Sequence, residues 1–113
     1  MFDTKRLQKI QRELEPTTYS IRTIDGQRAL YRTLDGGYCI EVTSPLYRSD
    51  RGYSSVYLWH GEVGDELVRA AHRVPLRAVD LERVGANFEQ AAELHAKGAV
   101  RSPRNQQVVY PHL

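Results

Sequence analysis

The sequence predicts an α+β fold in which a mainly antiparallel sheet of five strands, or six if the C-terminal tail adds one, carries an N-terminal helix and a late helix. Apolar residues follow helical spacing near both ends of the region 1–100, and they alternate with period two in between. Asp-Gly pairs at 25–26 and 35–36 separate the first alternating runs, as in β-hairpins. The 113 residues suit one domain. We therefore assign residues 1–100 to a single α+β domain and residues 101–113 to a C-terminal tail.

The first helix is expected to begin at Asp3, whose carboxylate can cap it, and to run through Glu15. Leu7, Ile10 and Leu14 recur at helical intervals, and a proline directly after the helix prevents its continuation. The other side of this helix is charged, so its apolar stripe needs cover from the rest of the fold. We expect the sheet to provide that cover.

Three strands are expected next, each rich in β-branched and aromatic residues: Thr17–Ile24, Gln27–Leu34 and Tyr38–Thr43. In the third strand, Cys39 and Glu41 alternate with apolar side chains and therefore point to the opposite face. Antiparallel sheets of this kind commonly leave one face to solvent.

Two further strands complete the predicted sheet. In Ser54–His60, Val56 and Leu58 share one face and Tyr57 and Trp59 share the other, so we expect cover on both faces. Leu67–Leu76 also fits a helix, but Pro75 disfavours helix at the residue before it, and we favour a strand. The acidic segment Gly61–Glu66 between them is predicted to be a solvated turn.

The late helix is expected to begin at Asp80, with Val79 and Val84 packed as a hydrophobic staple, and to end before Gly98. Beyond it, the tail contains a β-prone run, Gln106–Tyr110, between two prolines. A free strand edge promotes association. We therefore expect this run to dock on an edge of its own sheet, on a second copy of the chain, or on a partner.

Composition limits the functional classes. Sixteen Lys and Arg against fourteen Asp and Glu give a net charge of +2, less than a general nucleic-acid binder usually shows. No apolar run is long enough for a membrane span, and the N-terminus lacks the apolar centre of a signal peptide, so we expect a cytoplasmic protein without membrane contact. Thirteen of the basic residues are arginines, which suits carboxylate or phosphate recognition but also fits a GC-rich bacterial or phage genome.

The sequence shows no motif for catalysis or metal binding. The single Cys39 is expected to be a packed strand thiol, and His60, His72, His95 and His112 lack the spacing of a metal or catalytic motif. His60 and His72 could become cross-strand neighbours only if the last two strands pair as expected, and a metal would then still need a third ligand. We expect no cofactor, no metal and no enzymatic activity.

The best candidate binding site is a loop rich in arginine and tyrosine, Ser44–Gly52, together with the start of the next strand and the basic tail. These residue types supply much of the binding energy in protein interfaces. The candidate residues are Tyr47, Arg48, Asp50, Arg51, Tyr53, Arg101 and Arg104. The alternative to a binding site is an ordinary solvent-exposed loop, in which Asp50 forms an ion pair with a neighbouring arginine.

The leading hypothesis is a small non-enzymatic protein-binding module, an adaptor or inhibitor of a larger assembly. The alternative is nucleic-acid binding, in which the same tyrosines stack on bases and the arginines contact phosphates. A homodimer formed through the tail or a sheet edge is a further expectation.

Overall fold

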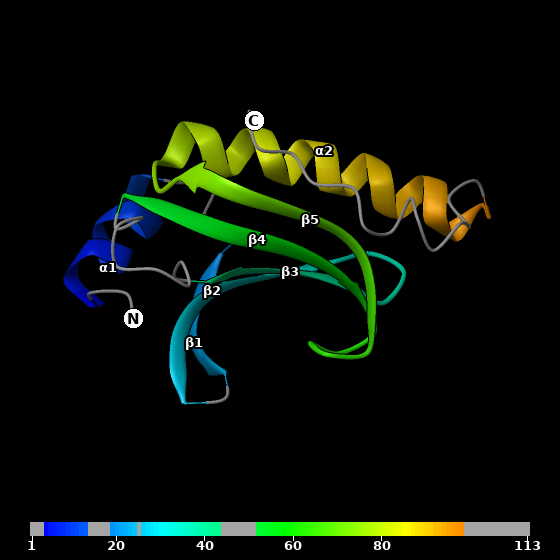
Figure 1. Cartoon of the computed structure of the whole chain (residues 1–113), viewed down its shortest axis with the longest axis horizontal. Coiled ribbons are helices and arrows are strands. Elements are labelled where there is room, and N and C mark those ends of the chain that lie inside the picture. The colour runs from blue at the N-terminus through cyan, green and yellow to red at the C-terminus, as the bar shows by residue number, and fades with distance from the viewer. Residues whose placement is uncertain (1–3, 14–18, 25, 44–51, 99–113) are drawn as a thin grey trace.

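The structure is a computed structural model and describes residues 4–13, 19–24, 26–43 and 52–98. Five strands form one antiparallel sheet in chain order, with a helix before it and a helix after it (Figure 1). The elements are α1 (Thr4–Glu13), β1 (Ser20–Ile24), β2 (Gln27–Leu34), β3 (Tyr38–Thr43), β4 (Tyr53–His60), β5 (Glu66–Pro75) and α2 (Ala78–Ala96). The predicted α+β fold is confirmed. Among these elements, no helix combines the length and the apolarity needed to cross a bilayer.

The strands agree with the sequence where the alternating pattern is strong. β2 and β3 have the predicted bounds, and the ambiguous stretch before Pro75 is a strand. β5 pairs with β4 through two irregularities of register, and Arg73 in β5 has a left-handed φ of 56°. Irregularities of this kind bend a strand and increase its twist. Figure 1 shows β5 curving strongly along its length.

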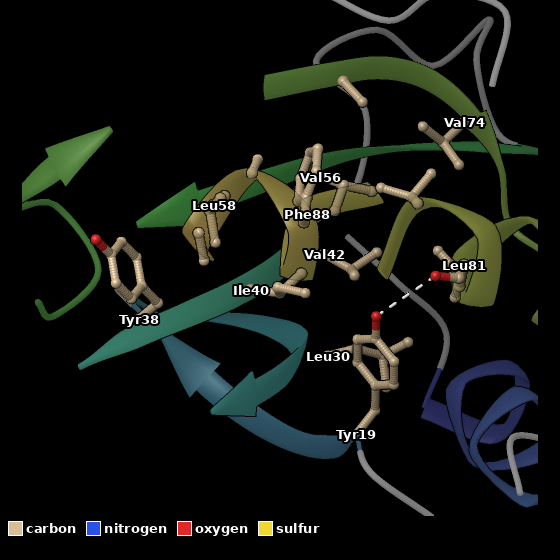
Figure 2. Close-up of a cluster of buried hydrophobic side chains, with 14 of the residues drawn as sticks. Tyr19, Leu30, Tyr38, Ile40, Val42, Val56, Leu58, Val74, Leu81 and Phe88 are labelled. Atoms are coloured by element: carbon tan, nitrogen blue, oxygen red, sulfur yellow. Dashed lines mark hydrogen bonds between the residues drawn. The ribbon is translucent and has the colours of Figure 1, made fainter. Parts of the chain in front are cut away.

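One face of the sheet packs against both helices, and we call it the helix face. Its buried residues are mainly aliphatic and include Leu30, Ile40, Val42, Val56 and Leu58. They meet Leu81, Val84 and Phe88 of α2, and Ile10 of α1 joins the same cluster. Figure 2 shows the Phe88 side chain surrounded by this cluster. The predicted packing of the two helices on the sheet is confirmed.

The observed α1 is shorter than the predicted helix, and Asp3 and Leu14 lie outside the described residues. Ile10 is buried, as its spacing predicts. The Gln11 side chain donates a hydrogen bond of 2.9 Å to the backbone carbonyl of Tyr19, just before β1. This bond ties the helix to the first strand.

The start of α2 differs from the prediction. The helix begins at Ala78, and its N-cap, Arg77, makes no capping hydrogen bond with its side chain. Asp80 lies in the first turn, where it is buried and accepts a 2.7 Å hydrogen bond from Arg77 Nε. Val79 is 57% exposed, so the predicted hydrophobic staple is wrong. The end before Gly98 is confirmed, with a φ of 76° that a glycine adopts without strain.

Candidate functional site

Most of the binding site predicted from the sequence lies outside the described residues. This holds for Tyr47, Arg48, Asp50, Arg51, Arg101 and Arg104. Tyr53 is described and begins β4, where the Arg73 guanidinium carbon lies 4.5 Å from the centre of its ring. Tyr53 alternates along β4 with Ser54 and Val56, which are buried on the helix face. Its side chain therefore belongs to the opposite face of the sheet.

We call that opposite face the open face, because both described helices pack on the other side. Cross-strand pairing aligns Tyr31 with Glu41 and Glu41 with Tyr57, and it aligns Cys39 with Trp59. The side chains gathered there are mostly aromatic or polar: Tyr31, Cys39, Glu41, Tyr53, Ser55, Tyr57, Trp59 and His72. Tyr57 and Trp59 are half-buried, so the predicted cover on both faces of β4 is only partial on this side.

Three aromatic rings form a continuous row on β4 and β5. The Tyr57 ring centre lies 6.0 Å from that of Trp59 and 5.8 Å from that of His72. Ser55 Oγ lies 3.1 Å from His72 Nδ1, which fixes the imidazole at the end of the row. Half-buried rings with a polar tip combine a large contact area with hydrogen-bonding capacity, and are enriched at protein interfaces.

A buried carboxylate orients the indole of this row. Glu41 is 7% exposed and accepts a 3.0 Å hydrogen bond from Trp59 Nε1. A side chain that is already held in one orientation loses less conformational entropy when a partner covers it. Trp59 is therefore preorganised as a contact residue.

Exposed arginines stand on both edge strands of the sheet. The Arg22 guanidinium carbon of β1 lies 3.9 Å from the centre of the Tyr31 ring, and Arg73 of β5 covers Tyr53. A guanidinium stacked on a ring keeps its N–H groups in the plane parallel to the ring, where they can reach a carboxylate or phosphate.

Cys39 is a buried thiol on the open face. Its Sγ lies 3.5 Å from the carbonyl of Gly61, the acceptor of a weak S–H hydrogen bond. Burial raises the pKa of the Cys39 thiol, which opposes formation of the reactive thiolate. The expectation of a packed strand thiol is confirmed.

A second polar arrangement, which we call the histidine cluster, consists of Tyr38, His60, Glu66 and His95. The sheet register places Tyr38, His60 and Glu66 in one row across β3, β4 and β5, and His95 reaches this row from the last turn of α2. Glu66 Oε1 lies 2.9 Å from His60 Nδ1, and Glu66 Oε2 lies 3.3 Å from His95 Nε2. The Tyr38 hydroxyl lies 2.7 Å from His95 Nδ1. One carboxylate thus bridges two imidazoles.

Ring packing and hydrogen bonds define the electrostatics of the cluster. The buried Tyr38 ring stacks on His60 with a centre-to-centre distance of 4.5 Å and meets His95 edge-on at 5.6 Å. The hydrogen bond with His60, together with the proximity of His95, lowers the pKa of the Glu66 carboxyl. Desolvation raises the pKa of the Tyr38 phenol, which therefore stays protonated at neutral pH. His60, Glu66 and His95 each offer one ligand atom, and these atoms lie within 4.8 Å of one another.

β4 and β5 pair as expected, but their register does not make His60 and His72 neighbours. His60 lies opposite Glu66, whereas His72 lies beside Ser55 near the other end of β4. Glu66 is the first residue of β5 and not part of a solvated turn. A prediction of the register of the β4–β5 hairpin from the sequence could have placed Glu66 opposite His60. Only the docking of α2 adds His95.

Comparisons with known proteins give no family for the chain. No protein-family model, curated protein or solved structure matches it. The open face and the histidine cluster are therefore the features from which a function can be inferred.

Proposed function

We propose that the chain is a small, non-enzymatic protein-binding module that docks a partner protein on its open face. The observation that carries this proposal is the aromatic row on β4 and β5, which the described helices leave uncovered. Tryptophan, tyrosine and arginine are the residues most enriched among binding hot spots. The open face carries all three types, and Glu41 already holds Trp59 in place.

The loop and the open face support the same role. Tyr53 directly follows the loop that the sequence nominates for binding, and it lies on the open face under Arg73. A partner seated on the aromatic row would therefore also meet the loop. We infer an adaptor or inhibitor that uses both, in a cytoplasmic setting that suits its single free cysteine.

Charge defines the chemistry of the partner surface. Arg22 and Arg73 are exposed on the two edge strands, whereas the Glu41 carboxylate between them is buried. A complementary surface presents apolar groups to the aromatic row and carboxylates to the arginines at its rim. An interface of ordinary size buries about 800 Å² on each partner.

Buried thiol and phenol groups support binding over catalysis. Cys39 is kept as a thiol by burial, and Tyr38 is kept as a phenol. Neither group is therefore an activated nucleophile at neutral pH.

The test is affinity capture from a lysate of the source organism, with and without nuclease, using the wild type and two variants. Trp59→Ala removes the centre of the aromatic row, and Leu94→Ala removes an apolar side chain that is 40% exposed on α2. We expect a nuclease-resistant protein that the wild type and Leu94→Ala retain and that Trp59→Ala binds at least about thirtyfold more weakly, as for a hot-spot residue.

Three outcomes would contradict the proposal. Equal capture by Trp59→Ala, with circular dichroism confirming its fold, removes the open face as the docking surface. Capture that nuclease abolishes favours the nucleic-acid alternative. Recovery of a second copy of the chain alone, confirmed by sedimentation, favours a homodimer.

A further inference from the structure

We infer that the histidine cluster is a zinc site in which His60, Glu66 and His95 each supply one ligand atom and Tyr38 orients His95. The cluster lies where His60 pairs with Glu66, on the helix face, whereas the aromatic row lies on the open face. The inference is independent of the proposed protein binding, and either one can fail without the other.

The donor set of the cluster suits zinc. Two imidazole nitrogens and one carboxylate oxygen are a combination found in zinc sites that keep a fourth position open. Calcium and magnesium prefer oxygen ligands alone, and copper(I) prefers sulfur. In the cluster, the ligating groups come from His60, Glu66 and His95, so neither an all-oxygen nor a sulfur set is present among them.

Distances in the cluster suit a tetrahedral ion. Zinc bonds of about 2.0–2.2 Å place neighbouring ligand atoms roughly 3.3 Å apart in a tetrahedron. Glu66 Oε1 lies 2.9 Å from His60 Nδ1, Glu66 Oε2 lies 3.3 Å from His95 Nε2, and one ligand atom from each of the three residues lies within 4.8 Å of the other two. The side chains of His60 and Glu66 are 43% and 45% exposed, so they can rotate around an ion without displacing the core. The same exposure lets water or a partner's side chain take the fourth position.

Tyr38 provides the support that a ligating histidine needs. A zinc-bound imidazole is neutral and usually donates its remaining N–H to a fixed acceptor. His95 Nδ1 lies 2.7 Å from the hydroxyl of Tyr38, so its other nitrogen, Nε2, is the one that points at Glu66. When zinc binds Nε2, the imidazole proton resides on Nδ1 and is donated to the Tyr38 oxygen. Tyr38 is buried and packed against both imidazoles, which makes it a positioning residue.

Zinc would also link separate parts of the fold. His60 and Glu66 come from β4 and β5, and His95 comes from the far end of α2. A ligand that binds only the folded chain raises its stability. Zinc is therefore expected to raise the melting temperature and to hold the end of α2 on the sheet.

The first experiment titrates zinc chloride into the untagged full chain by calorimetry. A His112→Ala background removes the one histidine that the structure does not describe. We expect one zinc per chain, with affinity at least about tenfold lower in Glu66→Gln and in His95→Gln, and about tenfold lower in Tyr38→Phe. His72→Ala is the matched control, because His72 lies beside Ser55, and it should bind zinc as tightly as the background protein.

The second experiment uses the wild-type chain, so it does not depend on the folding of any variant. Zinc should shift the imidazole nitrogen resonances of His60 and His95, leave those of His72 in place, and put the His95 proton on Nδ1. The melting temperature should rise in the same samples.

Two results would overturn the inference. One is the absence of any stoichiometric zinc binding at about 100 µM zinc, far above the range of structural sites. The other is zinc binding that survives Glu66→Gln and His95→Gln, or that shifts His72 as much as His60 and His95.

Discussion

The two faces of the sheet use the same strands but carry different chemistry. The helix face holds mainly aliphatic side chains that α2 seals from water, with the histidine cluster at one end, whereas the open face holds mostly aromatic rings, hydroxyls, an imidazole and a carboxylate. Consecutive strand residues point to opposite faces, so one step along β4 separates the two environments. Leu58 is fully buried in the core, while its neighbour Trp59 is half-buried and hydrogen-bonded to Glu41.

This difference divides two tasks between the faces. Apolar burial on the helix face stabilises the fold. Buried polar groups on the open face lower the stability of the fold unless they are hydrogen-bonded. Glu41 is hydrogen-bonded to Trp59, and Ser55 is hydrogen-bonded to His72. We infer that such groups are present there for recognition.

The largest stability effect is expected on the helix face. Phe88→Ala removes a fully buried ring from the centre of the core and should lower the free energy of unfolding by about 3–5 kcal/mol. Leu94→Ala, on the exposed side of the same helix, should change it by less than about 0.5 kcal/mol. Chemical denaturation measures both. A Phe88→Ala loss below 1 kcal/mol would mean that the helix face does not provide the main core.

The next effect is expected in binding. Trp59→Ala should weaken capture of the partner by about 2 kcal/mol or more, as for a central hot-spot residue. Its effect on the free energy of unfolding should be smaller than that of Phe88→Ala, because Trp59 is only half-buried. Titration with the captured partner and denaturation of the free chain give the two values. If Trp59→Ala lost as much stability as Phe88→Ala, the open face would contribute to the core as much as the helix face does, which would contradict the proposed difference between the faces.

A smaller effect is expected at the buried carboxylate of the open face. Glu41→Gln replaces a charged acceptor of the Trp59 N–H with a neutral one and should lower the free energy of unfolding by about 1 kcal/mol. Glu82→Gln, at an exposed position on α2, is the control. An increase in stability of Glu41→Gln would show that the buried charge costs more than its hydrogen bonds contribute.

The smallest effect depends on pH. Hydrogen bonding with His60 lowers the pKa of Glu66 in the folded chain, so its contribution to stability is complete above the unfolded pKa of about 4.5 and disappears as the pH falls through the folded value. In metal-free buffer, Glu66→Gln should be less stable than the wild type at neutral pH by under about 1 kcal/mol, since the group is partly exposed. The difference should shrink on acidification. A difference that grows with acid would contradict the sign of the shift.

Alternation with a period of two and the Asp-Gly turns predicted the five strands, although β1 begins at Ser20 and leaves out Tyr19, which the predicted strand Thr17–Ile24 includes. Alternation correctly placed Cys39 and Glu41 opposite the apolar residues of β3. The start of α2 was wrong because Asp80, a typical N-cap residue, instead accepts a hydrogen bond from Arg77 within the first turn. A capping residue near a helix start therefore does not fix the first residue of the helix.

The histidine cluster could not be predicted from spacing, because its members come from four elements. Cross-strand register brings Tyr38, His60 and Glu66 together, and the docking of α2 supplies His95. The open face needed a different kind of information. Sequence alternation predicted that Tyr57 and Trp59 point the same way, but it could not show that both described helices pack on the other side.

Site-specific photo-crosslinking tests most directly whether the partner docks on the open face. A photoreactive benzoylphenylalanine is introduced in place of Tyr57, in the aromatic row, or in place of Leu94, exposed on α2. If the partner docks on the open face, we expect a crosslink to it from position 57 and none from position 94. A crosslink from position 94 alone, or equal crosslinking from both positions, would contradict docking on the open face.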